Sequence, residues 1–270
     1  MSLAVLLEEV IGATAADTGE TARRVVARSA ANTALVYTDH FVTRVGLTAD
    51  LNVAAEHACS VTARAGGVPA PEVVATGRLS SGRAYLVSRR IAGWRPRSRA
   101  ALCAAGELLA RLHRLDGRTF PAEQHCRRRR RDRYPIARTA LALLDRERRK
   151  WAEPALERAA DDWLECRAGP VHGDFGSRNL LARGDTVIGI VDWTDARQAS
   201  PETDLGQVDL ADLEAVWVGY RSAGSARIDF SLVAGHSLAR YLALESFGVF
   251  PAGTSMAVVD WWRGAPAEVS

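Results

Sequence analysis

The chain has 270 residues, of which 47% are hydrophobic and 25% are charged, a balance typical of water-soluble globular domains. It contains no run of about eighteen apolar residues, which excludes a transmembrane helix, and its net charge of +3 is too small to require nucleic acid as a partner. We therefore expect one large or two modest domains that bind neither membranes nor nucleic acids.

The first ten residues predict a short amphipathic helix. Glu8 and Glu9 stand where a signal peptide would remain apolar, and no basic residues precede them, so we expect a cytoplasmic protein. The four cysteines are widely separated and form no Cys-x-x-Cys pair. Reduced thiols are therefore expected, and neither a zinc site nor a disulfide framework.

Residues 1–90 predict a small lobe that is rich in β-strands. Short β-prone segments alternate with polar turns, and a helical segment that ends at Gly66 and Gly67 interrupts them. The predicted strands are 23–28, 33–37, 41–46, 73–75 and 84–88, and the predicted helix is 51–64. We expect five strands around one main helix, with the first three strands joined as antiparallel hairpins.

Residues 91–270 predict a larger, mainly helical lobe, joined to the first by a hinge at 88–93. Leucines at helical spacing predict a helix over 100–115. Residues 134–166 predict one or two charged amphipathic helices, with a break at Pro154. Short β-prone runs then surround a polar motif, and helices return toward the C-terminus.

Arginine dominates the basic residues of this chain. Of the 35 lysines and arginines only Lys150 is a lysine, so arginine abundance alone says little about function. The run 127–131 holds five arginines without interleaved aromatic residues. We interpret this run as a solvated connector and not as a nucleic-acid-binding segment.

The strongest chemical signal lies in residues 171–181, Val-His-Gly-Asp-Phe-Gly-Ser-Arg-Asn-Leu-Leu. Asn179 follows Asp174 by five residues, and Asp192 ends a β-prone run thirteen residues later. In kinases such an aspartate takes a proton from the acceptor hydroxyl, while an amide and a second carboxylate hold Mg²⁺ against nucleotide phosphates. The spacing predicts phosphoryl transfer from ATP or GTP to a small molecule.

With these motifs the chain resembles the aminoglycoside phosphotransferase family, which comprises antibiotic O-phosphotransferases with a protein-kinase-like fold. The residues that carry the resemblance are His172-Gly173-Asp174, Asn179, Asp192-Trp193, and Asp204-Leu205 after Ser200-Pro201. The resemblance spans nearly the whole chain. It implies an α+β fold of two lobes: a small antiparallel sheet with one main helix that binds nucleotide (1–90), and a helical lobe with the catalytic loop, metal site and substrate pocket (91–270).

The resemblance also implies roles for individual residues. Asp174 is the expected catalytic base, and Asn179 and Asp192 are the expected Mg²⁺ ligands. The expected nucleotide-binding residues are Ser29, Asn32, Arg44, Glu56, Ser88, Arg89 and Arg90. The expected supporting residues are His172, which braces the catalytic loop, Trp193, which packs beneath the metal loop, and Asp204, which anchors the catalytic loop.

Arg44 departs from the pattern of kinase-type folds, which place a lysine at this strand position and pair it with a helix glutamate. Arginine can bind phosphate through two parallel hydrogen bonds, so Arg44 remains the expected phosphate-binding residue, with Glu56 as its partner. Three alternatives stay open. Arg44 could be an outward-facing strand residue, Glu56 a solvated helix residue, and 29–32, which lacks a glycine-rich motif, a plain hairpin turn.

Acidic residues concentrate after the metal motif, where Arg197 is the single base up to position 214. They are Asp195, Glu202, Asp204, Asp209, Asp212 and Glu214. An acidic surface beside the metal loop favours a cationic acceptor, and Asp195 and Glu202 are the expected substrate-binding residues. The alternative is that these acids stabilise helix N-termini.

The predicted function is O-phosphorylation of a small cationic antibiotic, of the aminoglycoside or basic peptide type, which gives resistance to it. A metabolite kinase of the same fold, acting on an amino alcohol, a sugar or a homoserine-like compound, is the first alternative. A non-catalytic nucleotide-binding regulator is the second, and the intact set of Asp174, Asn179 and Asp192 argues against it.

Overall fold

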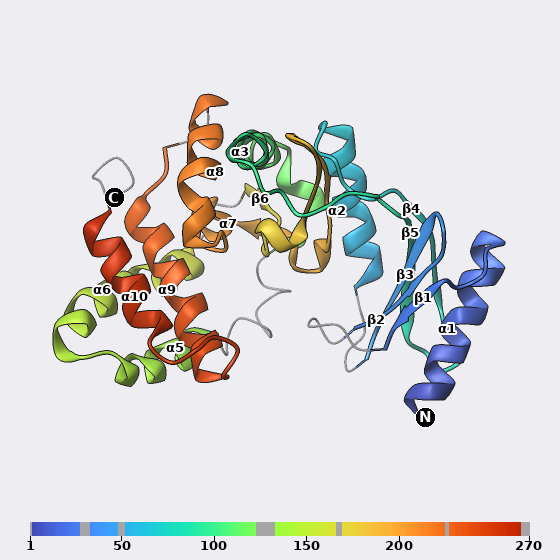
Figure 1. Cartoon of the computed structure of the whole chain (residues 1–270), viewed down its shortest axis with the longest axis horizontal. Helices are drawn as coiled ribbons and strands as arrows, with labels where there is room; N and C mark the ends of the chain where they lie inside the picture. Colours follow the sequence, from blue (N-terminus) through green and yellow to red (C-terminus); the bar gives the residue numbers. More distant parts are fainter. Residues whose placement is uncertain are drawn as a thin grey trace.

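The computed structural model describes residues 2–27, 33–47, 52–122, 133–165, 169–224 and 227–265. A five-stranded antiparallel sheet occupies the N-terminal part, in the order β1-β2-β3-β5-β4. Its strands are β1 (Arg24–Val26), β2 (Thr33–Tyr37), β3 (Phe41–Gly46), β4 (Val73–Arg78) and β5 (Ala84–Arg89). The sheet and the mainly helical remainder confirm the predicted α+β fold (Figure 1).

An N-terminal helix, α1 (Leu3–Thr18), covers one side of the sheet (Figure 1). Leu6 and Val10 of this helix belong to a small hydrophobic core that it shares with the strands. The helix extends well beyond the predicted 1–10, because its second half attaches to the sheet through a polar contact. The buried hydroxyl of Thr14 donates to that of Thr43 on β3 at 2.8 Å, a contact that apolar periodicity does not reveal.

Helix α2 (Val53–Ala65) lies on the side of the sheet that faces the helical part (Figure 1). Asn52 caps its N-terminus, and Glu56 lies in its first turn. Cys59 and Ala63 are buried in the larger hydrophobic core, most of which comes from the C-terminal helices. Since residues before position 90 contribute to that core, the two-lobe boundary at 88–93 stays a prediction.

The described residues of the C-terminal part form helices with four short strands between them. The helices are α3 (Arg99–His113), α5 (Arg133–Ala140), α6 (Arg146–Glu165), α7 (Glu202–Leu205), α8 (Leu210–Ser222), α9 (Phe230–Ser246) and α10 (Thr254–Gly264). The strands β6 (Gly169–Val171) and β9 (Arg197–Ala199) pair antiparallel, as do β7 (Leu180–Arg183) and β8 (Thr186–Ile190). Single 3₁₀ turns are η1 (Gly117–Thr119), η2 (Leu141–Leu143), η3 (Ser177–Asn179) and η4 (Trp193–Asp195).

The predicted helix break at Pro154 is wrong, because α6 runs through this residue. A proline removes one N–H and leaves the carbonyl of the preceding turn without its partner. Pro154 is exposed, so water can satisfy that carbonyl. On the opposite side Ala152, Leu156 and Ala159 are buried, and Gly235 of α9 packs closely against this helix. Packing therefore keeps the helix continuous.

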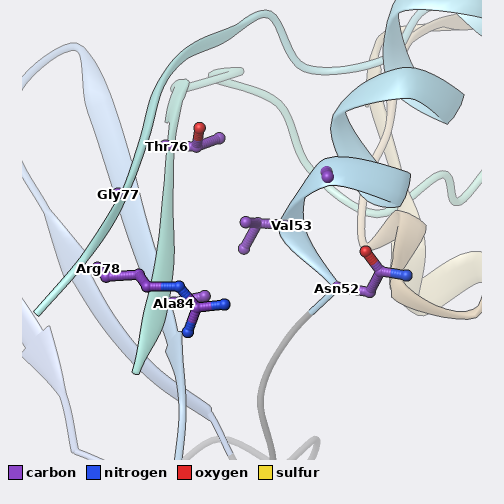
Figure 2. A pocket seen from close by; sticks show the side chains of 7 residues that line it. Asn52, Val53, Thr76, Gly77, Arg78 and Ala84 are labelled. Atoms are coloured by element: carbon purple, nitrogen blue, oxygen red, sulfur yellow. The ribbon is translucent and has the colours of Figure 1, made fainter. Parts of the chain in front are cut away.

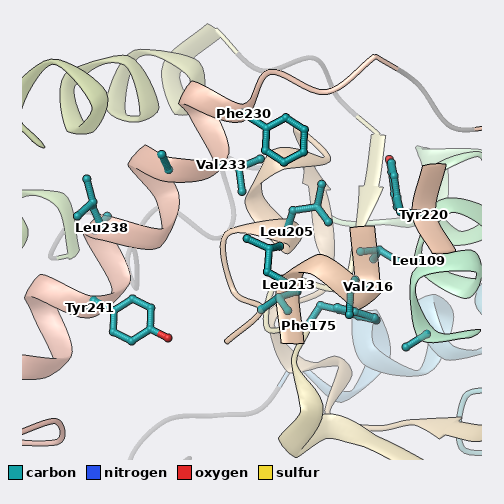
Figure 3. Close-up of a cluster of buried hydrophobic side chains, with 14 of the residues drawn as sticks. Leu109, Phe175, Leu205, Leu213, Val216, Tyr220, Phe230, Val233, Leu238 and Tyr241 are labelled. Carbon is teal, nitrogen blue, oxygen red and sulfur yellow. The ribbon is translucent and has the colours of Figure 1, made fainter. Parts of the chain in front are cut away.

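The larger core also anchors the loop that carries the phosphoryl-transfer motif. Phe175, the residue after Asp174, is fully buried in a cluster with Leu205, Leu213 and Val216 (Figure 3). Burial of one large side chain fixes the backbone of its neighbours, so Asp174 projects from a held position.

No helix among the described residues is both long and apolar enough to cross a membrane. Cys103 is a free thiol.

Candidate active site

Asp204 fixes the backbone just before Asp174. Its carboxylate accepts the N–H groups of His172 at 2.7 Å and Gly173 at 2.6 Å, and Nε2 of His113 lies 3.2 Å away. Full burial by itself would raise the pKa of Asp204, but the contacts with His113 and His172 hold that pKa below its usual range. The buried, ionised carboxylate is thus a rigid anchor for the start of the catalytic loop.

Gly173 is required by its backbone and by its surroundings. Its φ of 81° lies in the left-handed region, and a Cβ built there would lie 2.2 Å from Nη1 of Arg197 and 2.2 Å from the carbonyl oxygen of Asp195. Arg197 is buried and donates to that same carbonyl at 2.7 Å. The segment after the metal motif therefore packs directly against the catalytic loop.

Asp174 and Asn179 contact each other. The turn η3 folds the chain back, so that Nδ2 of Asn179 donates to the backbone oxygen of Asp174 at 2.8 Å and to its Oδ2 at 2.9 Å. With Nδ2 used in this way, Oδ1 of Asn179 remains an acceptor that can bind a cation.

The β7–β8 hairpin brings Asn179 to Asp192. Leu180 pairs with Ile190, and the N–H of Val191 donates to the carbonyl of Asn179 at 2.9 Å. The two predicted metal ligands therefore flank the same end of one hairpin.

Asp192 has a left-handed backbone, with a φ of 65°, and it is the only non-glycine among the described residues with a positive φ. Its neighbours hold this conformation. Trp193 is buried, donates from Nε1 to the carbonyl of Ile190 at 2.7 Å, and meets the ring of His172 edge-on at 4.9 Å. Nε2 of His172 lies 3.0 Å from the carbonyl of Val191. His172 and Trp193 thus connect the catalytic loop to the metal loop.

Arg44 connects the sheet to the metal loop. It forms ion pairs with Glu56 of α2 and with Asp192, and it is only 8% exposed. These contacts exclude an outward-facing Arg44 and a solvated Glu56. Burial raises the pKa of Glu56 to about 6 in spite of the nearby guanidinium. Burial also opposes ionisation of Asp192, yet Arg44 and a hydrogen bond from Thr194 hold its pKa below the usual range.

The predicted hinge residues lie at the end of β5. Ser88 is within the sheet, opposite strands β3 and β4. The N–H of Arg89 donates to the carbonyl of Glu72 at 2.8 Å, and that of Arg90 to the carbonyl of His40 at 2.7 Å. Because both N–H groups have protein partners, contacts of this segment with a nucleotide base stay a prediction.

Ser29 and Asn32, predicted to cover the nucleotide, lie outside the described residues, as does the arginine run 127–131.

The two predicted substrate-binding residues differ in position. Glu202 is buried, and its carboxylate accepts the N–H of Asp229 at 3.0 Å, which supports the start of α9. Asp195 is partly exposed, and its charge contributes to the raised pKa of Glu56. Of the two, only Asp195 lies beside the site. Substrate binding by Glu202 stays a prediction, which the burial of this residue does not support.

The remaining acids after Asp192 do not form one open surface. The carboxylate of Asp204 is bound by the backbone of the catalytic loop. That of Asp209 is bound by Arg240 at 2.8 Å, and that of Glu214 by Arg99 at 2.9 Å. Asp212, half-buried in the first turn of α8, accepts a hydrogen bond from Ser177 of the catalytic loop. Its position places a carboxylate beside the catalytic loop, whereas the sequence pattern identified Asp212 only as one of the acids after the metal motif.

Two further contacts of the site were not predicted. The hydroxyl of Thr194 donates to Oδ1 of Asp192 at 2.7 Å, and Arg178 forms an ion pair with Oδ1 of Asp174. The spacing of four residues between Asp174 and Arg178 was a usable signal, but the general abundance of arginine hid it.

The donor set suits Mg²⁺. No group of three or more His, Cys, Asp or Glu side chains that could hold a metal occurs within the described ranges. Asp192 and Asn179 instead offer one carboxylate and one amide oxygen. Mg²⁺ is commonly bound by one or two carboxylates together with water and substrate phosphates, so this incomplete oxygen set fits it.

A separate pocket of about 300 Å³ lies between the N-terminus of α2 and strands β4 and β5 (Figure 2). It is lined by Asn52, Val53, Ala54, Thr76, Gly77, Arg78 and Ala84. None of the predicted site residues lines it, so it is not part of the cluster described above.

Comparisons with known proteins identify the family of the chain. A family model described as "Phosphotransferase enzyme family" matches residues 18–227, which confirms the resemblance drawn from the motifs. No curated protein matches the chain.

Among solved structures, an aminoglycoside 2'-phosphotransferase-IIIa in complex with GDP is 14% identical with a TM-score of 0.63, covering 96% of this chain and 98% of that one. A choline/ethanolamine kinase family protein from Mesorhizobium loti is 18% identical with a TM-score of 0.63, covering 99% and 97%. The aminoglycoside phosphotransferase APH(3'')-Id from Streptomyces rimosus, in complex with ADP and streptomycin, is 18% identical with a TM-score of 0.61, covering 90% and 99%. At these identities the structures establish a shared fold and not a shared substrate.

Proposed function

Because the chain belongs to the phosphotransferase enzyme family, we propose that it transfers the γ-phosphoryl group of ATP or GTP, with Mg²⁺, to a hydroxyl of a small cationic antibiotic and so gives resistance to it. The observation that carries the proposal is one cluster of side chains. Arg44 forms ion pairs with both Glu56 and Asp192. Asn179 donates a hydrogen bond to Asp174 and lies at the same end of the β7–β8 hairpin as Asp192. The proposed location is the cytoplasm, where ATP and GTP are available.

In this reaction Asp174 accepts a hydrogen bond from the acceptor hydroxyl and orients its oxygen toward the γ-phosphorus. The acceptor oxygen bonds to the γ-phosphorus as the bond between that phosphorus and the β–γ bridging oxygen breaks, the hydroxyl proton passes to the Asp174 carboxylate, and the nucleoside diphosphate leaves. Because the transition state is loose, the orientation of the hydroxyl counts more than the basicity of the carboxylate.

The remaining residues of the cluster hold the nucleotide. Arg44 offers its guanidinium to the α- and β-phosphates while Glu56 keeps it in place. Asn179 and Asp192 would hold Mg²⁺, which would neutralise part of the phosphate charge. The segment 88–90 and the loop at 29–32 complete the nucleotide site in this proposal.

Two observations support a cationic acceptor of the aminoglycoside or basic peptide type. Asp195 and Asp212 place carboxylates beside the metal loop and the catalytic loop. One similar structure is that of an aminoglycoside phosphotransferase with streptomycin. Glu202 is left out of the proposed pocket because it is buried.

A metabolite kinase is the second candidate function. It is favoured by the choline/ethanolamine kinase family protein, which matches this chain with the same TM-score, 0.63, as the aminoglycoside 2'-phosphotransferase. An amino alcohol acceptor would also meet the carboxylates of Asp195 and Asp212.

The test is a panel of hydroxylated basic antibiotics, amino alcohols and sugars, assayed for nucleoside diphosphate release with MgATP and with MgGTP. We expect release that depends on the acceptor, a mass increase of one phosphoryl group in the product, and loss of both in Asp174→Asn. If only amino alcohols are phosphorylated, the metabolite kinase replaces the antibiotic phosphotransferase as the proposed function. Absence of turnover with every acceptor would overturn the phosphotransferase proposal.

A further inference from the structure

Arg178 lies in the catalytic loop, between the predicted base and the predicted metal ligand. The turn η3 is closed by a hydrogen bond from the N–H of Asn179 to the carbonyl of Gly176 at 2.9 Å. This turn points two side chains back to Asp174. Arg178 forms an ion pair through Nη2 with Oδ1, and Asn179 donates to Oδ2 at 2.9 Å. Both carboxylate oxygens of the predicted base are therefore held by protein groups.

The ion pair is open to an incoming molecule. The side chain of Arg178 is 38% exposed and that of Asp174 is 22% exposed, whereas Arg44 in the nucleotide part of the site is only 8% exposed. A carboxylate has about four lone-pair positions, so two contacts leave room for the acceptor hydroxyl. An acceptor that reaches Asp174 must therefore approach the guanidinium as well.

We propose that Arg178 is a positioning and specificity-determining residue, which holds Asp174 toward the acceptor and selects a hydroxyl with no ammonium group on the neighbouring carbon. This inference rests on the proposed phosphotransferase function. It narrows the class of acceptor, because the phosphorylated hydroxyl of a cationic acceptor must have no ammonium group on the neighbouring carbon.

The selection follows from charge. Asp174 alone would attract an ammonium next to the reacting hydroxyl, but Oδ1 of Asp174 is already bound by the guanidinium of Arg178, a cation that repels a second positive charge. An ammonium about 5 Å from the guanidinium is repelled, and at a partly exposed site this repulsion corresponds to about a tenfold loss in kcat/KM. Positive groups farther from the hydroxyl escape this effect, and Asp212, which is hydrogen-bonded to Ser177 of the catalytic loop, offers them a carboxylate.

The test compares the wild type with Arg178→Gln and Arg178→Lys. Arg221→Gln is the matched control, because Arg221 is exposed in the last turn of α8, about 13 Å along the helix axis from Asp212. Acceptors are used in pairs that differ by a hydroxyl or an ammonium beside the reacting hydroxyl, as kanamycin A and kanamycin B do at one ring carbon. The readouts are kcat and KM for each acceptor, and the phosphorylated position by ³¹P and proton NMR.

In the wild type we expect phosphate on a hydroxyl without a neighbouring ammonium and about tenfold preference for the hydroxyl member of a pair. Arg178→Gln should lower kcat about tenfold for all acceptors and remove most of the preference. Arg178→Lys should keep the preference, because it keeps the charge, and Arg221→Gln should change neither quantity.

The inference fails if the active wild type phosphorylates hydroxyls beside an ammonium equally well, or if Arg178→Gln retains both kcat and the preference. The wild-type product position needs no variant, so it decides the matter even if a substitution prevents folding. If the wild type shows no turnover, both the proposed function and this inference fail. That result differs from the two outcomes above, in which the wild type is active and only the inference fails.

Discussion

Replacement of Arg44 tests the contact that joins the sheet to the metal loop. In Arg44→Ala, Glu56 and Asp192 lose their common partner while they remain largely removed from water. Breaking a buried ion pair by removing one partner costs about 3–5 kcal/mol of stability. Loss of a charge-assisted contact to phosphate costs a further 1.5–3 kcal/mol in transition-state binding, or about ten- to a hundredfold in kcat/KM for the nucleotide.

Arg44→Lys separates charge from geometry. The two guanidinium nitrogens of Arg44 reach two different carboxylates, Nη2 to Glu56 and Nη1 to Asp192. Lysine keeps the charge but offers a single point of contact. We therefore expect Arg44→Lys to recover part of the stability and less of the nucleotide kinetics.

The assay combines thermal unfolding with the nucleotide dependence of diphosphate release at saturating acceptor. Arg23→Ala is the control, because Arg23 forms an ion pair with Asp39 at 2.9 Å in which both side chains are more than half exposed. Such exposed pairs contribute about 0–1 kcal/mol, so this variant should behave like the wild type. If Arg44→Ala also behaves like the wild type in both measurements, the role assigned to Arg44 is refuted.

Three further predictions concern the same site. Asp174→Asn should lower kcat about a hundredfold or more with little change in nucleotide affinity, measured by calorimetric titration, since in the proposed reaction this residue orients the acceptor and not the nucleotide. Glu56 loses its charge below its raised pKa of about 6, so kcat/KM for the nucleotide should fall as the pH drops through that value. Glu56→Gln should show no such inflection, and an inflection that persists would assign it to another group. Gly173→Ala should abolish turnover, because its Cβ would overlap Arg197 and the carbonyl of Asp195, and full activity would show that the loop adjusts.

The strands and the motif spacing were predictable because they depend on local chemistry. The predicted segments 33–37 and 41–46 coincide with β2 and β3, since β-branched and aromatic residues lie between short polar turns. The approach of Asn179 to Asp192 was likewise predictable, because the β-prone segments between them can pair as a hairpin. In both cases the contacting residues are close in sequence, so a local sequence pattern is enough to predict the contact.

Other features depended on partners far away in the sequence. Glu202 resembles an exposed helix-start acid, and only the position of α9, whose first N–H groups need acceptors, explains its burial. Pro154 predicts a break when its helix is considered alone. Packing against α9 nevertheless keeps this helix continuous. The ion pair of Arg44 with Asp192 joins residues 148 positions apart, which no local pattern contains.

The two carboxylates predicted to handle the proton and the metal are each paired with an arginine. Arg44 pairs with Asp192 and Arg178 with Asp174, while the single lysine, Lys150, pairs with Glu147 on α6. An arginine does not lose its charge at working pH, so neither pair can be opened by deprotonating its cation. In the proposed reaction the nucleotide phosphates compete with Glu56 and Asp192 for Arg44, whereas the acceptor hydroxyl takes a lone-pair position that Arg178 leaves open on the Asp174 carboxylate. In this proposal nucleotide binding is coupled to release of the ion pairs of Arg44, so that an arginine can take the phosphate-binding role for which kinase-type folds use a lysine.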